Sequence, residues 1–440
     1  MKVIAFESIL ATPHTETLLE LSVLHSLAGD EVIYVPAYRF VGSSPWNSPI
    51  NGDPSLPRSI TEWDRYIVNL LDPFVTFWVP DYVYQQFPQE WFEGSILDTY
   101  IGLATRTLYG SINSIEVSAN IIAPRIAEVS TQVKMSIHLM QVIVAKLKPD
   151  RVYCFNGRTP SSWPLSRIAE KLKLDCRFHE RGASIEKYAL FRKPPAYNSA
   201  WRELFQSHRA KRDLTSSKLN AAYFFESQAT GKLKNFGYTN RDFNESWPNF
   251  LPTDEPFVVY FGSTDAEIDT VPDQDVYFPT LPSQFACVSL LKTVCKKLGI
   301  KLVIRLHPST PFQLDEYVSL DDGISCFVIP PRSQISSYYL GSKALARFSV
   351  GSTIGFELAY RGYDCALMAK SLVTGEVGLS TTISEDSILR YIQNGTNQSS
   401  VADYVHFFGD FCLSYGEDYQ VFRPTGQFSG VIDLTFLHKH

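Results

Sequence analysis

The chain lacks the features that mark several broad classes of protein. It has no uninterrupted run of the roughly 18 apolar residues that a membrane-spanning helix needs, because the most apolar stretch, 70–87, is broken by Pro73 and Pro80. Its seven cysteines form no CxxC or Cys/His spacing, which predicts reduced buried thiols and no metal site. It has no basic excess either: 40 Lys and Arg against 46 Asp and Glu give a net charge of −6, which argues against a nucleic-acid binder.

Alternating strands and helices dominate the first half of the sequence. Apolar runs and helical spacing predict strand 3–6, helix 16–27, strand 32–36, helix 130–147, strand 151–155, helix 161–172 and strand 176–178. This alternation is typical of a parallel sheet with crossover helices. We therefore expect an α/β Rossmann-like domain over 1–205, with a largely helical insertion at about 60–147.

A second alternation follows a weakly patterned stretch that we interpret as a linker, 206–255. It predicts strand 257–261, helix 282–298, strands 302–306 and 324–329, a helix from 333, strand 344–348, helix 353–361, strand 364–368 and helices near 385–393 and 400–415. We expect a second Rossmann-like domain over 256–400 and a C-terminal helical segment and tail over 401–440. Two doubly wound domains that face each other form a cleft, and such sheets bind ligands beyond the carboxyl ends of their strands.

One candidate phosphate site follows the strand at 344–348. Small residues end that strand, and a helix begins at Thr353 with Ser352 as its N-cap. The free N–H groups of the first helical turn and the two hydroxyls suit a phosphate or diphosphate. Glu357 lies one turn further and could accept hydrogen bonds from a ribose. The alternative is a capped helix without a ligand.

Two more polar motifs end strands of the same predicted sheet. Arg305 and His307 lie where a strand end can meet an anionic group. Ser263 and Thr264 permit close approach of a ligand to the backbone, and Asp265 follows with a carboxylate. Plain polar turns remain the alternative for both motifs.

The first predicted domain has a matching pair of motifs. Asn156 and Arg158 follow one strand, while Glu180 and Arg181 follow the next, so the two groups should lie side by side at one sheet edge. A carboxylate beside two arginines normally stays ionised. Glu180 could therefore act as a base only if it is buried, or could orient an acceptor hydroxyl; the alternative is a structural ion pair.

Together these motifs resemble bacterial surface-polysaccharide glycosyltransferases of GT-B architecture. The motifs are, in order, Asn156-Gly157-Arg158, Glu180-Arg181-Gly182, Arg305-Leu306-His307-Pro308 and Ser352-Thr353-Ile354-Gly355-Phe356-Glu357, and the opening Ala11-Thr12-Pro13-His14-Thr15-Glu16-Thr17 is also similar to the start of that family. The resemblance implies transfer of a sugar from a nucleotide-activated donor to a surface polysaccharide or glycolipid, with no metal and no cofactor besides the nucleotide sugar.

Within that superfamily the chain is most similar to the retaining β-Kdo transferases, which use CMP-Kdo. That resemblance implies Asp265 as nucleophile, Glu180 near the acceptor and His307 near the donor. The chain departs from the family where relatives carry two adjacent acids, because here Ala266 separates Asp265 from Glu267. Which of the two acids faces the donor, and the stereochemical course, are therefore open.

Two other functions stay open at this point. A polyol-phosphate transferase of the glycerophospho type would share the cleft, the His-Pro turn and the phosphate site, but its reaction would take place at phosphorus. A non-catalytic glycan-binding or assembly protein would keep aromatic platforms and would not need Glu180, Asp265 and His307 in one cleft.

Aromatic residues and one basic run suggest further contacts. Aromatic residues make up 13% of the chain, and nine of them fall between Phe74 and Tyr100. Since Tyr and Trp stack on sugar faces, we expect Trp78 and Tyr82 to bind the acceptor, while most other rings pack in the core. The basic run 208–212 could touch anionic lipid headgroups or form a solvated helix end. We expect a cytoplasmic protein, with this run as the candidate contact to the inner face of the membrane.

Overall fold

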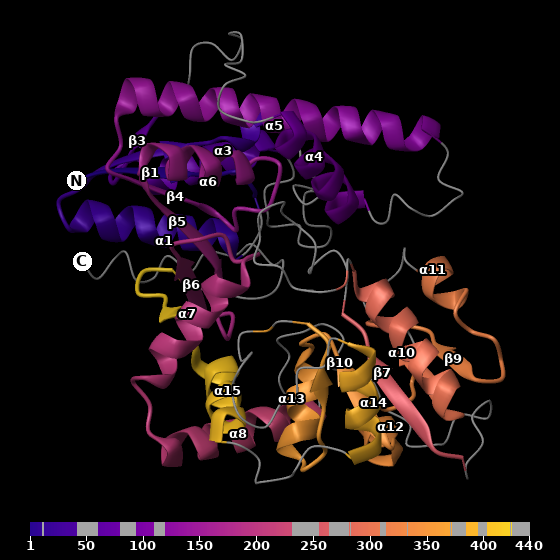
Figure 1. Cartoon of the computed structure of the whole chain (residues 1–440). Coiled ribbons are helices and arrows are strands. Elements are labelled where there is room, and N and C mark those ends of the chain that lie inside the picture. Colours follow the sequence, from indigo (N-terminus) through magenta and orange to yellow (C-terminus); the bar gives the residue numbers. More distant parts are fainter. Residues whose placement is uncertain are drawn as a thin grey trace.

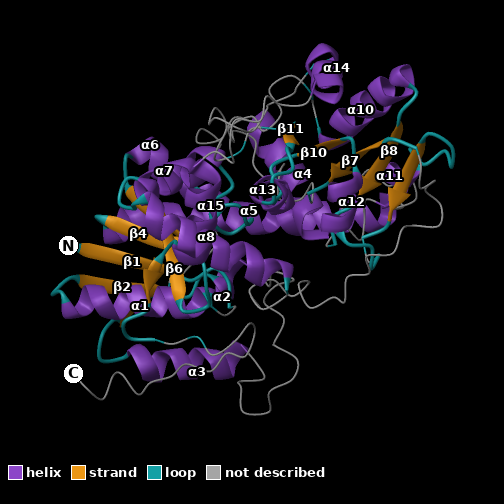
Figure 2. Cartoon of the chain, turned by 90° about the horizontal axis from the view of Figure 1, so that it is seen from below, coloured by secondary structure: helices purple, strands orange, loops and turns teal. Residues whose placement is uncertain are grey.

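The computed structural model forms two α/β domains, which appear as two separate groups of strands in Figure 2. It describes residues 1–10, 13–41, 60–79, 94–109, 119–230, 255–263, 281, 283–308, 314–331, 333–369, 371, 384–394, 403–422 and 424. All structural statements concern these residues.

The first domain is built on a seven-stranded sheet with the order β3-β2-β1-β4-β5-β6-β12. Its strands are β1 (Lys2–Phe6), β2 (Glu31–Val35), β3 (Thr76–Phe77), β4 (Arg151–Phe155), β5 (Asp175–Arg181), β6 (Lys187–Phe191) and β12 (Glu417–Asp418). Strands β1 to β5 are parallel, whereas β6 and β12 are antiparallel to their neighbours. The first five follow the 3-2-1-4-5 order of a Rossmann fold, so the strand order reverses between β1 and β4.

The second domain repeats this topology in a five-stranded sheet. Its strands are β7 (Phe257–Phe261), β8 (Lys301–Arg305), β9 (Cys326–Ile329), β10 (Ala346–Ser349) and β11 (Ala366–Leu367). They are all parallel in the order β9-β8-β7-β10-β11, and the order reverses between β7 and β10. The predicted fold class, two Rossmann-like doubly wound domains, is thereby confirmed; the cleft between them stays a prediction.

Helices flank both sheets. They are α1 (His14–Leu27), α2 (Tyr38–Val41), α3 (Ile60–Leu71), α4 (Gly94–Tyr109), α5 (Ala119–Leu147), α6 (Trp163–Leu172), α7 (Asn198–Arg209), α8 (Leu214–Ala229), α10 (Gln284–Leu298), α11 (Leu314–Val318), α12 (Ser337–Lys343), α13 (Thr353–Tyr360), α14 (Glu385–Asn394) and α15 (Asp403–Ser414). In the first domain α5 and α6 cover one face of the sheet and α1 covers the other (Figure 1).

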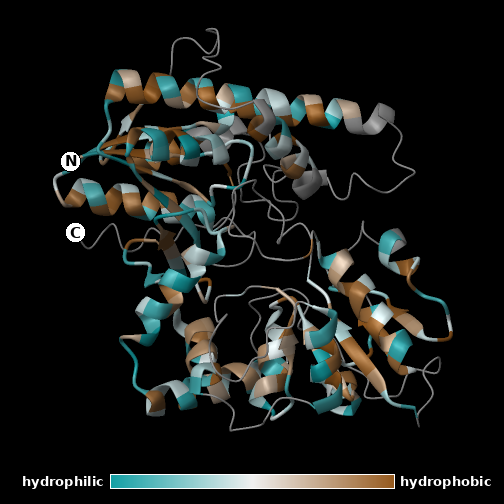
Figure 3. Ribbon diagram, in the orientation of Figure 1, coloured by the Kyte–Doolittle hydropathy of each residue, from teal (hydrophilic) through white to brown (hydrophobic). Residues whose placement is uncertain are grey.

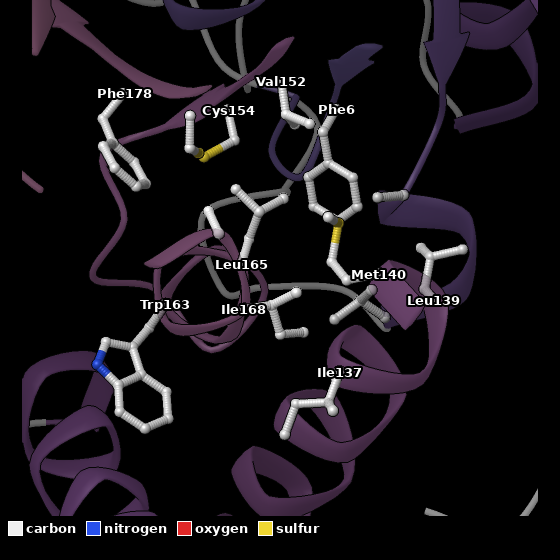
Figure 4. Packing of buried hydrophobic residues seen from close by; sticks show 14 of the residues in the cluster. Phe6, Ile137, Leu139, Met140, Val152, Cys154, Trp163, Leu165, Ile168 and Phe178 are labelled. Atoms are coloured by element: carbon white, nitrogen blue, oxygen red, sulfur yellow. The ribbon is translucent and has the colours of Figure 1, made fainter. Parts of the chain in front are cut away.

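The core of the first domain forms where α5 and α6 meet the sheet (Figure 4). The apolar stripe predicted on α5 is buried there at Val133, Ile137 and Met140, although the helix begins at Ala119, earlier than the stripe indicates. The alternating apolar and polar turns of α5 follow from this one-sided burial (Figure 3). All seven cysteines are free, and all but Cys412 are buried, as predicted.

The structure corrects three details of the expected organisation. Strand β5 runs on to Arg181, so Glu180 and Arg181 belong to the strand instead of following it. The segment 60–147 is largely helical, but it also supplies β3. The stretch 206–255, expected as a linker, contains helix α8. The domain boundaries themselves stay predictions.

Helices α7, α8 and α15 form the junction between the two domains. Phe408 of α15 stacks on Phe356 of α13, with ring centroids 3.9 Å apart, and Phe411 packs edge-on against Phe205 of α7. After α15 the chain returns to the first domain as residues 415–422, which we call the C-terminal strap. Its β12 pairs with β6. The strap therefore adds a strand to the sheet with which the chain begins.

No helix in the described ranges is both long enough and apolar enough to cross a membrane.

Candidate functional site

A polar cluster lies at the carboxyl edge of β4 and β5, next to the point between β1 and β4 where the first sheet reverses its order. The Glu180 carboxylate accepts a hydrogen bond from the Asn156 side-chain amide. Its Oε1 accepts another from the backbone N–H of Arg181 at 3.0 Å. Nε2 of His14, the first residue of α1, lies 3.8 Å from the same oxygen. The adjacency predicted for the Asn156 and Glu180 motifs is confirmed, and His14 joins them.

The loop after β4 holds Asn156 in an unusual backbone conformation. Asn156 has a φ of 55° and Gly157 a φ of 75°; the left-handed region costs a residue with a side chain of the order of 1 kcal/mol. A Cβ on Gly157 would lie 2.7 Å from the Phe178 ring, so only glycine fits there. Tyr100, stacked on Trp163 at 3.7 Å, donates a hydrogen bond to the Arg158 carbonyl at 2.7 Å. The loop is thus fixed where the amide of Asn156 reaches Glu180.

Two histidines lie together in the cluster. The His14 ring lies 4.2 Å from the Phe155 ring and 6.3 Å from the His179 ring, centroid to centroid. Burial lowers the pKa of His14, Glu180 raises it, and Arg181 and Arg158 lower it further. Burial also holds the pKa of His179 well below its ordinary value. Both imidazoles are therefore neutral at pH 7.

Several buried polar atoms of this cluster have no hydrogen-bond partner among the described residues. They are His14 Nδ1, Asn156 Oδ1 and both ring nitrogens of His179. Buried polar atoms normally have partners, from the protein or from water. In His14 the unpartnered atom is Nδ1, and not the Nε2 that lies 3.8 Å from Glu180.

For the other predicted acceptor-binding residues the structure shows fewer contacts with the cluster. Arg158 and Arg181 both lie near enough to His14 to lower its pKa. Trp78 is half-buried and packs against the core of the first domain, and Tyr82 lies outside the described residues. Contact of these residues with an acceptor stays a prediction.

The second sheet also carries polar groups at the carboxyl ends of its strands. Ser263 follows β7, and buried Gln284 clamps its backbone, because Gln284 accepts from the Ser263 N–H at 2.8 Å and donates to its carbonyl at 2.9 Å. His307 follows the neighbouring strand β8 and is half-buried. The turns carrying Ser263 and His307 therefore start from adjacent strands. Thr264, Asp265 and Glu267 lie outside the described residues, so their predicted roles remain untested.

The start of α13 lies at the reversal point of the second sheet. Ser352 is the N-cap residue, as predicted, but its side chain makes no capping hydrogen bond. Buried Ser349 accepts hydrogen bonds instead, from the N–H groups of Gly351 at 3.2 Å and Ser352 at 3.0 Å. The Ser352 hydroxyl is therefore not used for capping, and the first N–H groups of a helix have no intrahelical acceptor. This arrangement suits a phosphate.

Two predicted donor residues are engaged inside the domain. Glu357 is buried, accepts hydrogen bonds from Tyr338 and Thr353, and has a raised pKa because of burial. A ribose would have to compete with these partners. The Arg305 guanidinium donates to the carbonyls of Pro330 at 2.6 Å and Ser333 at 2.8 Å. Arg305 thus stabilises the turn after β9 and is engaged in hydrogen bonds within its own domain.

Sequence reasoning gave no role to three residues of these two clusters: His14, which was noted only within the opening motif 11–17, Gln284 and Ser349. His14 does stand at a detectable position, directly before the first apolar helical run. Within the described ranges no group of three or more His, Cys, Asp or Glu side chains could hold a metal ion.

No protein-family model matches this chain, and no curated protein matches its sequence. Among solved structures, it is similar to the β-Kdo 2,7-transferase KpsC of Thermosulfurimonas dismutans, with 16% identity and a TM-score of 0.36 over 61% of this chain and 79% of that chain. The β-Kdo 2,4-transferase KpsC of the same organism is 11% identical, with a TM-score of 0.39 over 60% and 79%. The UDP-GlcNAc 2-epimerase of Methanocaldococcus jannaschii, in complex with UDP-GlcNAc and UDP, is 12% identical, with a TM-score of 0.31 over 93% and 98%. Scores this low do not establish a shared fold, so the fold of this chain rests on the strand order of its own two sheets.

Proposed function

We propose that this protein is a glycosyltransferase that moves a sugar from a nucleotide-activated donor to a hydroxyl group of a glycan or glycolipid acceptor. The observation that carries the proposal is the cluster of His14, Asn156 and Glu180, with its unsatisfied buried atoms, at the carboxyl edge of the first sheet. In the proposal, Glu180 takes the proton of the acceptor hydroxyl, and Asn156 holds the carboxylate in place. Neutral His14 binds the same hydroxyl group.

The second domain would hold the donor. The start of α13, with Ser352 and Thr353, would bind the phosphate, and His307 would stabilise the charge that develops on it as the bond to the sugar breaks. Ser263, clamped by Gln284, would approach the sugar through its backbone. We assign Asp265 to the anomeric carbon, either as nucleophile or as the carboxylate that stabilises an oxocarbenium-like state. The proposed donor is CMP-Kdo, on the sequence resemblance alone.

Activity of a matched pair of variants tests this assignment. We expect Glu180→Gln to reduce sugar transfer by about 10²-fold or more, because general-base catalysis contributes about 10²–10⁴-fold. Glu186→Gln, a change of the same chemistry at an exposed position between β5 and β6, should leave turnover unchanged. The assay measures nucleotide release and product mass with CMP-Kdo and with UDP and GDP sugars. Equal turnover of the wild type and Glu180→Gln would refute the role of Glu180.

Nucleotide choice and the course of the reaction need separate measurements. A matching nucleotide at about 100 times its dissociation constant stabilises the protein by about 2.7 kcal/mol, which thermal unfolding with CMP, UDP and GDP detects. Intact-mass spectrometry of Glu180→Gln with donor alone tests a covalent intermediate. An added sugar mass on Glu180→Gln that is absent when Asp265→Ala is introduced as well supports the covalent intermediate. No added mass on Glu180→Gln contradicts it. If instead a phosphate-containing group is transferred, the polyol-phosphate reaction replaces the one proposed.

We also propose that the corner between α7 and α8 is the membrane contact predicted from the basic run. Arg209, Lys211 and Arg212 lie there, and Leu219 and Tyr223 of α8 are 71% and 59% exposed on one helical face. Basic residues attract anionic lipid surfaces at about 1 kcal/mol each. Sedimentation with vesicles containing phosphatidylglycerol should capture the wild type and lose a Lys211→Glu/Arg212→Glu variant; no capture of the wild type would refute the contact.

A further inference from the structure

The C-terminal strap is bonded to the first turn of α1. The Tyr419 hydroxyl lies 2.5 Å from Thr17 Oγ1 and donates to the Pro13 carbonyl at 3.2 Å. Thr17 itself donates to the same carbonyl at 2.9 Å. These three oxygen atoms form a triangle in which only two hydrogen bonds can exist at a time, because each hydroxyl has one proton to donate. The triangle lies around the turn that carries the imidazole, since Pro13 directly precedes His14.

The strap is held on α1 by a second, stronger contact. The Glu20 carboxylate accepts hydrogen bonds from the backbone N–H groups of Gln420, Val421 and Phe422, at distances between 2.6 and 3.1 Å. Hydrogen bonds to a charged acceptor are roughly twice as strong as neutral ones. This contact fixes the backbone that carries Tyr419 and leaves its ring little freedom.

The same strap also reaches the strand that carries Glu180. The Tyr415 hydroxyl donates to the Arg181 carbonyl at 3.3 Å, and the Ala183 N–H donates to the Tyr415 carbonyl at 2.9 Å. One continuous segment therefore contacts the backbone beside both members of the pair His14 and Glu180, although those two residues come from α1 and β5.

We propose that Tyr419 is a positioning residue, whose hydroxyl sets the first turn of α1 and thereby the placement of His14 against Glu180. Its catalytic meaning rests on the function proposed above. The geometric claim does not, since it concerns only where His14 lies.

The titration of His14 reports this placement. The charged or titratable groups that face it are Glu180, Arg181 and His179 of β5 and Arg158 after β4. Burial is the main cause of the lowered pKa of His14. A loosened first turn would admit water to the ring and weaken its burial, so the pKa should rise toward the ordinary 6.5.

The experiment compares Tyr419→Phe with Tyr188→Phe. The Tyr188 ring lies 5.0 Å from the Tyr419 ring and also belongs to the first domain, but it comes from β6 and not from the strap. NMR titration of the full-length proteins, with the His14 signal assigned by its loss in His14→Gln, should show a rise of about half a pKa unit or more in Tyr419→Phe. Tyr188→Phe should match the wild type.

The outcomes separate this inference from the proposed function. An unchanged His14 titration in Tyr419→Phe would overturn the positioning role, even if the variant is less stable. A raised pKa supports that role, and it does so equally if no protein in the set transfers sugar. If Tyr419→Phe does not fold, Thr17→Val removes the other hydroxyl of the triangle and must give the same rise. Where transfer is measurable, the acid limb of its pH profile should move to higher pH in Tyr419→Phe alone.

Discussion

A close contact between α8 and α15 at the domain junction depends on Gly409 of α15. A Cβ at this position would lie 2.7 Å from the Ala221 Cβ and 2.8 Å from the Ala221 Cα of α8. Real Cβ atoms do not approach a neighbouring backbone so closely, so the change Gly409→Ala must move the two helices apart.

The expected cost follows from two opposing effects. Overpacking a well-packed contact costs about 1–3 kcal/mol, while replacing a glycine inside a helix by alanine gains about 0.5–1 kcal/mol. Gly409→Ala should therefore lower the free energy of unfolding by up to about 2.5 kcal/mol. Gly102 of α4 is the matched control, because a Cβ there meets no described atom within 4 Å. Gly102→Ala should raise the free energy of unfolding by about 0.5–1 kcal/mol.

Urea unfolding followed by tryptophan fluorescence measures both changes. Trp201 lies 5.5 Å from Tyr415, at the end of α15, and Trp163 stacks on Tyr100 of α4, so each altered helix has a nearby reporter. The same substitution should give opposite signs at the two positions. If Gly409→Ala is as stable as Gly102→Ala, the stability of the junction does not depend on the close contact between α8 and α15.

Two further predictions concern single contacts. Gln284→Ala removes the partner of the buried Tyr260 hydroxyl and the clamp on Ser263. It should lower the free energy of unfolding by about 1–3 kcal/mol and weaken nucleotide binding, and thermal unfolding with and without nucleotide measures both effects. Unchanged nucleotide affinity would mean that the clamp does not shape the donor site. The His208 imidazole is neutral at pH 7, because burial lowers its pKa from 6.5 despite the opposing effect of Asp410. Its contribution to stability is therefore complete above pH 6.5 and is lost as the pH falls through 6.5 toward the lowered value. Urea unfolding should show the wild type losing stability relative to His208→Gln over this window, and parallel pH dependences would exclude the shift.

The positions of the central strands of both domains along the chain could largely be predicted, because central parallel strands are buried on both faces and appear as continuous apolar runs. All five residues of β7 are buried, and its bounds match the prediction. Strands β3 and β12 have two residues each, too few for any pattern. Strand β6 was missed for another reason: its pairing with β5 is set by a turn between them, and Lys187 at its start weakens the apolar signal.

The candidate site could be predicted in part. Strand ends gave Asn156 and Glu180, since neighbouring parallel strands bring their carboxyl ends together. His14 could not be assigned to them, because only the folded sheet brings α1 beside β5. For Glu357 and Arg305 the residue type was compatible with a ligand, but their partners Tyr338 and the Pro330 carbonyl are brought to them only by the fold.

Because the C-terminal strap completes the first domain, that domain cannot finish folding until the end of the chain has been synthesised. While the second domain is still being made, the first sheet lacks β12, so β6 presents an unpaired edge to solvent. Exposed strand edges invite pairing with other chains. During the same interval Glu20 lacks the three backbone N–H groups that it binds in the finished protein. The first domain therefore reaches its final state only after the second has left the ribosome, and a fragment ending near residue 205 should be prone to aggregate.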